Sequence, residues 1–404
     1  MLNKGLDTLL AVAIVAAVAP IIAALLPGKR VPQVVILIFL GILIGPQGLG
    51  LGDAPSIDLL SNIGLGFLFL MAGYELNPSL LRERAGRLAM AGWAFSAVLA
   101  VGVVGVLTAV HFVYDFVPIG LALTTTALGT LLPILADNDM LSGRFGRHVL
   151  AAGAVGELFP IVAISVFLTR RGSFSAILSL LAVGVAALIL TALPRIIGDA
   201  RLRAVIAQGR QATAQTTLRW AVVLLMVLLV AAARFGLDVV LGAMLAGMVL
   251  RTWTRRMGVD TGPLEIKLEA VGYGIFIPIF FVASGMTLDV RAIIASPLRL
   301  LVFLGLLLVV RGLPALVIYA RVLPMVQRLE MILITATTMP LLIALAEIGQ
   351  QDGTMLPANA AAMVGAGVLS VLLFPPTAAA LRRRGQRGGD AGPAARPREE
   401  EVSG

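Results

Sequence analysis

The chain alternates between long apolar runs and short polar linkers from one end to the other. Most runs approach the roughly 20 residues that a helix needs to cross the hydrocarbon core of a bilayer. They lack the strict apolar–polar alternation of half-buried strands, and lipid admits only backbones that satisfy their own hydrogen bonds. The pattern therefore predicts an all-α polytopic membrane protein.

Thirteen transmembrane spans are predicted, separated by linkers that carry turn and breaker residues such as Pro27 and Gly349. The spans are 6–26, 31–45, 57–74, 87–110, 117–136, 146–169, 174–197, 218–234, 237–250, 268–287, 297–320, 328–348 and 357–380. None of the linkers has room for a soluble domain. Residues 382–404 are rich in glycine, proline and charge, which predicts a disordered tail.

Composition supports this class of protein and excludes several functions. Hydrophobic residues make up 59% of the chain and charged residues 13%, against roughly 25% charged residues in soluble domains. The sequence has no cysteine, which excludes disulfides, thiolate catalysis and iron–sulfur ligation. The two histidines, His111 and His148, are predicted at loop edges and are not paired. Because no phosphate loop, dinucleotide turn or catalytic triad pattern appears, neither an enzyme nor a cofactor is predicted.

The net charge of +9 is explained by topology. Most Lys and Arg residues lie in the linkers that follow odd-numbered spans and in the tail. The positive-inside rule then places the N-terminus outside and the C-terminus in the cytoplasm of a cell membrane, and no nucleic-acid surface is needed. The first span has a second interpretation as a signal peptide, because Lys4 precedes its apolar run.

The two halves of the chain resemble each other. Three pairs of segments recur in the same order, at similar offsets: 40–45 with 241–247, 67–76 with 279–288, and 124–133 with 335–340. Matching spans are an odd number apart, so the two copies are expected to be inverted in the membrane, as in many secondary transporters. The alternative is chance similarity among apolar segments. The expected division is an extra helix 1–30, a first repeat 31–210, a second repeat 211–381 and the tail 382–404.

Two ionisable residues are predicted at membrane depth, Glu157 and Arg311. A charge at the centre of a bilayer costs at least about 2.5 kcal/mol and tends to mark an ion or proton pathway. Gly153 and Gly156 share a helix face with Glu157, so another backbone can approach the carboxylate. Arg311 is the expected charge partner if the two helices meet. The alternative is an ion pair that only locks two helices.

Two prolines predict interruptions of membrane helices. Pro133 and Pro340 have no N–H to donate to the carbonyls of Gly129 and Ala336, so breaks are expected at Gly129, Pro133 and Pro340. The freed carbonyls, with nearby threonine hydroxyls, are candidate ligands because hard cations take several oxygens. The candidate hydroxyls are those of Thr124, Thr125, Thr126, Thr130, Thr337 and Thr338. The alternative for each threonine is a hydrogen bond to a carbonyl of its own helix.

Residues 41–50, 73–78 and 280–289 resemble a known family in sequence, order and spacing. They are similar to the monovalent cation:proton antiporters, in the Kef-like branch of the sodium/hydrogen exchanger superfamily. The resemblance covers roughly residues 31–380. It implies a homodimer in the membrane, built from two inverted repeats with two discontinuous helices that cross beside a carboxylate helix.

The resemblance also assigns roles to particular residues. The crossing helices would be 117–136 and 328–348, Glu157 matches the essential carboxylate, and Arg311 matches the family's basic residue. This sequence departs from the family at Gly156, where a carboxylate, Asn or Gln precedes the essential acid in other members. That departure leaves the ion and the coupling stoichiometry open.

The sequence thus predicts a secondary antiporter that exchanges Na⁺ or K⁺ for H⁺ by alternating access. Glu157 would hold either ion. A single carboxylate gives an electroneutral one-for-one cycle, and its rival is an electrogenic cycle with a second proton site at Asp137, Asp139 or Glu347. The alternative functions are a gated monovalent cation channel and a solute symporter driven by H⁺ or Na⁺.

Overall fold

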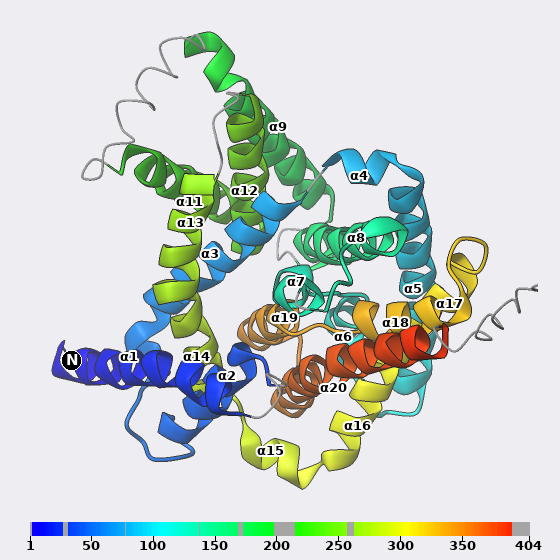
Figure 1. The fold of residues 1–404 in the computed structure, drawn as a ribbon. Coiled ribbons are helices and arrows are strands. Elements are labelled where there is room, and N and C mark those ends of the chain that lie inside the picture. Colours follow the sequence, from blue (N-terminus) through cyan, green and yellow to red (C-terminus); the bar gives the residue numbers. More distant parts are fainter. Residues whose placement is uncertain are drawn as a thin grey trace, which may run out of the picture.

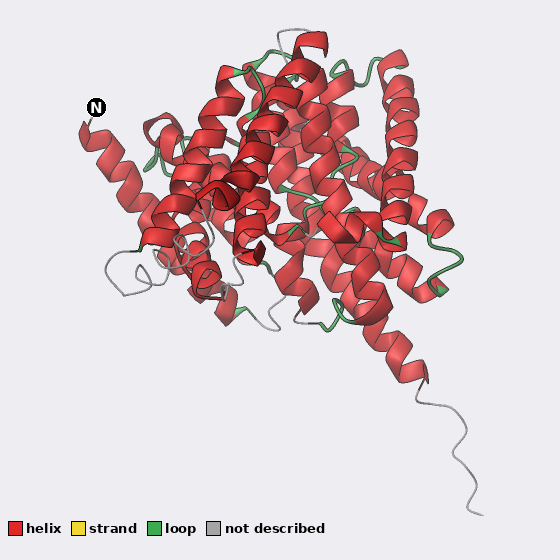
Figure 2. Cartoon of the chain, turned by 90° about the horizontal axis from the view of Figure 1, so that it is seen from above, coloured by secondary structure: helices red, strands yellow, loops and turns green. Residues whose placement is uncertain are grey.

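The computed structural model describes residues 2–26, 31–76, 78–136, 138–168, 173–197, 215–256 and 262–389. These residues form helices joined by turns and loops, and no β-strand occurs among them (Figure 2). The first half comprises α1 (Leu2–Leu25), α2 (Gln33–Ile44), a 3-10 turn η1 (Ala54–Ile57), α3 (Asp58–Glu75), α4 (Pro78–Arg82), α5 (Arg84–Ala109), α6 (Phe116–Ala122), α7 (Leu128–Ala136), α8 (Gly143–Phe167) and α9 (Ser173–Ile197).

The second half contains two helices widened by a π-helical turn. It comprises α11 (Thr216–Arg234), α12 (Val239–Arg256), α13 (Gly262–Val271), the π turn η2 (Gly272–Phe276), α14 (Ile277–Thr287), α15 (Val290–Ala295), α16 (Pro297–Leu306), the π turn η3 (Leu307–Gly312), α17 (Pro314–Ile318), α18 (Met325–Thr335), α19 (Pro340–Gln351) and α20 (Pro357–Gly389). The helices α13, η2 and α14 follow one another without a loop, and α16, η3 and α17 are interrupted only by a turn at Leu313.

Ten helical segments in the described part of the chain are long and apolar enough to cross a membrane. Each overlaps one of the predicted spans, so the all-helical prediction is confirmed. The three other predicted spans correspond to α2, to α6 with α7, and to α12. The total number of crossings stays a prediction.

The interior is built by close packing of helix backbones on glycine. A Cβ atom on Gly73 of α3 would collide with the carbonyl oxygen of Met244 in α12, and one on Gly285 of α14 would collide with that of Ile38 in α2. Helix α3 of the first half therefore packs on α12 of the second half, and α14 of the second half packs on α2 of the first. A twofold relation between the halves requires this exchange of partners, although the inverted repeat itself stays a prediction.

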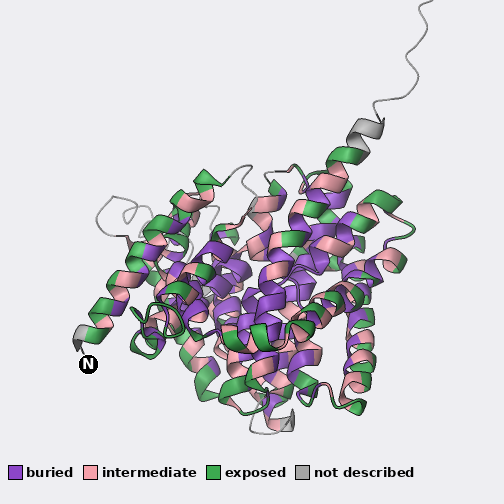
Figure 3. Cartoon of the chain, turned by 90° about the horizontal axis from the view of Figure 1, so that it is seen from below, coloured by how far each residue is buried: buried purple, intermediate pink, exposed green. Residues whose placement is uncertain are grey.

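Buried residues gather in the middle of the bundle, and exposed residues lie on its outside and at the helix ends (Figure 3). The short helices α6, α7, α18 and α19 occupy this middle region, beside α8 (Figure 1). Helix α20 runs on to Gly389, through the first part of the segment expected to be a disordered tail. The rest of that segment, 390–404, lies outside the described residues.

Candidate functional site

Two interrupted helices meet at the centre of the molecule. One consists of α6 and α7 with residues 123–127 between them, and the other of α18 and α19 with residues 336–339 between them. The backbone N–H of Ala127 donates to the carbonyl of Thr337 over 3.0 Å, and the N–H of Thr126 donates to the carbonyl of Gly156 in α8 over 2.9 Å. The two interruptions are thus bonded to each other and to the helix that carries Glu157.

The first interruption does not lie at Gly129 and Pro133, where it was expected. Helix α7 begins at Leu128 and runs through both residues. Helix α6 ends because the backbone N–H groups of Thr126 and Ala127 donate to carbonyls outside the helix. The second interruption lies directly before Pro340, which is the first residue of α19. Proline suits that position because its missing N–H would have no partner in the helix.

Most of the candidate threonine hydroxyls are bonded within their own helices. The hydroxyls of Thr124, Thr125, Thr130 and Thr337 donate to carbonyls three or four residues earlier, over 2.7, 2.7, 3.2 and 2.8 Å. Two of these bonds satisfy carbonyls of Leu121 and Ala122, at the end of α6. The threonines therefore cap the broken helix ends, where carbonyls would otherwise lack partners.

Other hydroxyl contacts join one interruption to the other. The Oγ1 atoms of Thr125 and Thr338 are 2.7 Å apart, and the Thr126 hydroxyl donates to the carbonyl of Thr335 over 2.6 Å. Ser370 of α20 was not anticipated, yet its hydroxyl accepts from the Thr338 N–H and donates to the Thr338 carbonyl. Its sequence signal was only that of one hydroxyl in an apolar run.

Glu157 lies on α8 beside the start of α7. Its side chain is 5% exposed, and the backbone N–H of Leu128, the first residue of α7, donates to its carboxylate. The other carboxylate oxygen, Oε2, is buried and has no hydrogen-bond partner. Burying an unpartnered carboxylate oxygen is costly, so this atom is a free acceptor for a proton or a cation.

Arg311 lies in the π turn of the α16–α17 helix and is 3% exposed. Its Nε donates to the Thr126 hydroxyl over 2.9 Å, and its Nη2 donates to the carbonyl of Ala152 over 3.0 Å. The expected ion pair with Glu157 is not formed: the contacts of neither side chain include the other. Arg311 instead joins the first interruption to α8.

The partial charges at helix ends explain why Glu157 and Arg311 can be buried without forming an ion pair. A helix N-terminus carries partial positive charge and a C-terminus partial negative charge. Glu157 accepts from the first residue of α7. Arg311 bonds to the Thr126 hydroxyl, which in turn donates to the last carbonyl of α18, that of Thr335. Each charge therefore lies near a helix end of opposite sign.

Gly156 leaves the space that Arg311 fills. A Cβ atom at this position would lie 2.5 Å from Nη2 of Arg311 and 2.7 Å from Oγ1 of Thr126. Both distances are shorter than side chains tolerate. A polar side chain before the essential acid, which the family resemblance led us to expect, would thus be incompatible with this placement of Arg311.

Two other acids considered from sequence, Asp139 and Glu347, take no part in the hydrogen bonds of the crossing. Asp137 is outside the described residues. Asp139 is exposed, in the turn before α8. Glu347 of α19 lines a cavity of about 490 Å³ together with Asp58 and Asp289, and Glu157 is not among the residues that line it.

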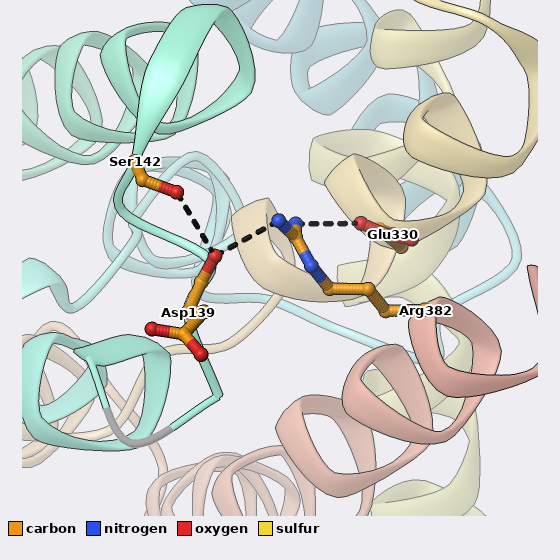
Figure 4. Close-up of polar contacts among 4 residues, drawn as sticks. All are labelled: Asp139, Ser142, Glu330 and Arg382. Carbon is orange, nitrogen blue, oxygen red and sulfur yellow. Dashed lines mark hydrogen bonds and ion pairs between the residues drawn. The ribbon is translucent and has the colours of Figure 1, made fainter. Parts of the chain in front are cut away.

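A separate polar cluster ties Arg382 of α20 to α18 and to the turn between α7 and α8 (Figure 4). The Nη1 atom of Arg382 is 3.6 Å from Oε2 of Glu330, a buried residue of α18, and its Nη2 donates to the carbonyl of Asp139 over 2.8 Å. That carbonyl also accepts from the Ser142 hydroxyl. The guanidinium lies over the ring of Phe145 as well.

Known proteins share the sequence pattern of this chain. Residues 13–382 match the family model described as "Sodium/hydrogen exchanger, transmembrane". The chain is 25% identical to YjbQ of Bacillus subtilis (strain 168), over 93% of this chain and 63% of YjbQ. It is 27% identical to the glutathione-regulated potassium-efflux system protein KefC of Shigella sonnei (strain Ss046), over 65% of this chain and 42% of KefC. The chain therefore spans less than two thirds of the length of these relatives.

The fold has a counterpart among solved structures. The sodium proton antiporter MjNhaP1 from Methanocaldococcus jannaschii matches over 95% of this chain and 99% of its own, with a TM-score of 0.67 and 19% sequence identity. A helical bundle of this kind, with a buried carboxylate beside crossed helix interruptions, is that of a multi-pass membrane transporter rather than an enzyme. The chain belongs to the sodium/hydrogen exchanger family.

Proposed function

We propose that this protein exchanges a monovalent cation, Na⁺ or K⁺, for a proton across the cell membrane. Glu157 binds the proton or the cation, and the site is exposed to one side of the membrane at a time. The N-terminus lies outside and the C-terminus lies in the cytoplasm, as the distribution of Lys and Arg indicates. The names of YjbQ, a putative Na⁺/H⁺ antiporter, and of MjNhaP1, a sodium proton antiporter, support ion exchange as the activity.

The observation that carries the proposal is the free Oε2 atom of Glu157. It is buried and unpartnered, while every candidate threonine hydroxyl nearby already donates a hydrogen bond or is held in one. A cation at Oε2 would still find lone pairs on these hydroxyls and on backbone carbonyls of the interruptions. A proton and a cation compete for the same oxygen, which couples their movements.

The crossing also supports a mechanism of alternating access. Only a few hydrogen bonds join the two interruptions, and helices α7 and α19 are short. Small rotations of one half against the other would therefore change the side of the membrane to which the site is open. Interrupted helices at mid-membrane are a recurring device of secondary transporters.

The test uses the purified protein in proteoliposomes with a pH-sensitive dye inside. An outward proton gradient is imposed and Na⁺, K⁺ and Li⁺ are added in turn. The expected result is cation-dependent proton movement by the wild type and none by Glu157→Gln. Glu83→Gln is the matched control, because Glu83 is an exposed acid between α4 and α5. Its activity should equal that of the wild type.

Three results would contradict the proposal. Proton movement by Glu157→Gln at the wild-type rate would remove Glu157 from the site. Cation flux that ignores the proton gradient would indicate a channel. Cation-dependent uptake of a second solute would indicate a symporter.

A further inference from the structure

Ser370 of α20 holds the backbone of the second interruption from a neighbouring helix. Its hydroxyl oxygen accepts from the backbone N–H of Thr338 over 3.1 Å and donates to the carbonyl of Thr338 over 2.9 Å. Both residues are fully buried, so these bonds satisfy groups that would be costly to bury without partners. One side chain thus serves both polar backbone groups of a residue that lies between α18 and α19.

The packing of α20 brings this hydroxyl to the interruption. Gly367 lies one helical turn before Ser370 on the same face. A Cβ atom on Gly367 would lie 3.1 Å from the carbonyl oxygen of Thr338 and 2.9 Å from a methyl carbon of Leu342. The Ser370 hydroxyl is also 2.7 Å from the carbonyl oxygen of Gly367. Because a hydroxyl has one proton and two carbonyls compete for it, a rotation of the hydroxyl can make or release the bond to Thr338.

Thr338 passes this restraint on to the first interruption. Its Oγ1 atom is 2.7 Å from that of Thr125, and the Thr125 hydroxyl donates its one proton to the carbonyl of Ala122. The proton between the two threonines must therefore come from Thr338. A chain of hydrogen bonds runs from Ser370 through both threonines to the end of α6, and the backbone that Ser370 holds determines where the Thr338 hydroxyl points.

The same region adjoins Glu157. The backbone N–H of Ala127 donates to the carbonyl of Thr337 over 3.0 Å, and the N–H of the next residue, Leu128, donates to the Glu157 carboxylate. Two consecutive amides therefore connect the second interruption with the carboxylate. A shift of the backbone at Thr337 and Thr338 would change where the oxygens of both interruptions lie relative to Glu157.

We propose that Ser370 is a positioning residue of the transport site. It sets the affinity for the cation by holding Thr338 and, through Thr338, by keeping the two interruptions in register. The inference rests on the proposed exchange at Glu157. Ser370 acts without contacting the ion, because its hydroxyl is engaged with Thr338 and Gly367.

The experiment measures KM and kcat in proteoliposomes for Ser370→Ala, Thr338→Val and the double variant. Na⁺, K⁺ and Li⁺ are each titrated at a fixed proton gradient. Ser370→Ala should raise the KM for the transported cation about threefold to tenfold, which is the effect of one lost hydrogen bond of ordinary strength, with a smaller change in kcat. Thr338→Val removes the hydroxyl that Ser370 positions and should raise the KM similarly. The double variant should be no worse than the weaker-binding single variant, because the two residues act in one chain.

Ser96→Ala is the matched control. Ser96 of α5 is also fully buried, and its hydroxyl donates to the carbonyl of Gly92 in its own helix over 3.1 Å. This variant loses the same chemical group and should keep the wild-type KM, whatever happens to its melting temperature. A Ser370→Ala variant that melts lower but has the KM of Ser96→Ala overturns the inference, because Ser370 would then have only a structural role.

Two other results would also overturn the inference. KM increases that multiply in the double variant would show that Ser370 and Thr338 act independently. If Ser370→Ala cannot be purified in a folded form, a wild-type KM in Thr338→Val decides against the chain of bonds. In each of these cases an inactive Glu157→Gln leaves the proposed exchange standing, whereas an active Glu157→Gln contradicts the exchange itself.

Discussion

Replacing Gly156 by alanine tests whether Arg311 really occupies the space beside Glu157. The new methyl group would lie 2.5 Å from Nη2 of Arg311, 2.7 Å from Oγ1 of Thr126 and 2.8 Å from Cβ of Thr126. The guanidinium cannot simply rotate away, because Nε and Nη2 are both bonded. The protein must therefore accept the overlap or give up one of those bonds.

The expected free-energy change follows from these two options. Overpacking a close-packed interior costs about 1–3 kcal/mol, and losing a hydrogen bond to a charged group costs about 1.5–3 kcal/mol. Alanine in a helix interior is more favourable than glycine by about 0.5–1 kcal/mol, which offsets part of this cost. Gly156→Ala should therefore lower the free energy of unfolding by about 1–2 kcal/mol, with a lower melting temperature.

The measurement is thermal unfolding of the purified protein in one detergent, followed by tryptophan fluorescence. Gly305→Ala in α16 is the control, because nothing lies within 4 Å of a Cβ atom there. That variant should melt at or slightly above the wild-type temperature. If Gly156→Ala matches Gly305→Ala, Arg311 does not fill the space, and the explanation given for the glycine is wrong.

Two further substitutions probe the buried arginine and the polar cluster at the end of α20. Arg311→Ala should lower the free energy of unfolding by about 3 kcal/mol through loss of two charge-assisted hydrogen bonds, and Arg311→Lys should lower it by less. Equal melting temperatures of Arg311→Ala and the wild type would contradict this. Arg382→Ala should cost about 2–3 kcal/mol because Glu330 keeps its buried charge without a partner. Adding Glu330→Gln should recover part of that loss, and a double variant that melts lower than Arg382→Ala would argue against the pairing.

The helical architecture could be predicted from sequence because apolar length decides it. In lipid a backbone must satisfy its own hydrogen bonds, so each long apolar run admitted one solution. Glu157 and Arg311 also stood out, since a charge in an apolar run is costly wherever the helix lies. These inferences needed no knowledge of which helices are neighbours.

The predictions from sequence that were wrong depended on which segments are neighbours in the folded protein. Pro133 was expected to mark the first interruption, but α7 tolerates it. The interruption lies where Thr126 donates to the distant carbonyl of Gly156, and a local pattern carries no information about such a bond. The same holds for Glu157 and Arg311, whose partners are a helix start and a hydroxyl on other segments.

The contacts of Arg382 matter to anyone who attaches a reporter to this protein. Its side chain contacts Glu330 of α18 and the Asp139 carbonyl in the turn between α7 and α8. A fluorescent protein fused after residue 381 would delete that connection, whereas one fused after Gly389 would retain it. Comparing the two fusions would show how far the reporter's signal depends on the contacts of Arg382.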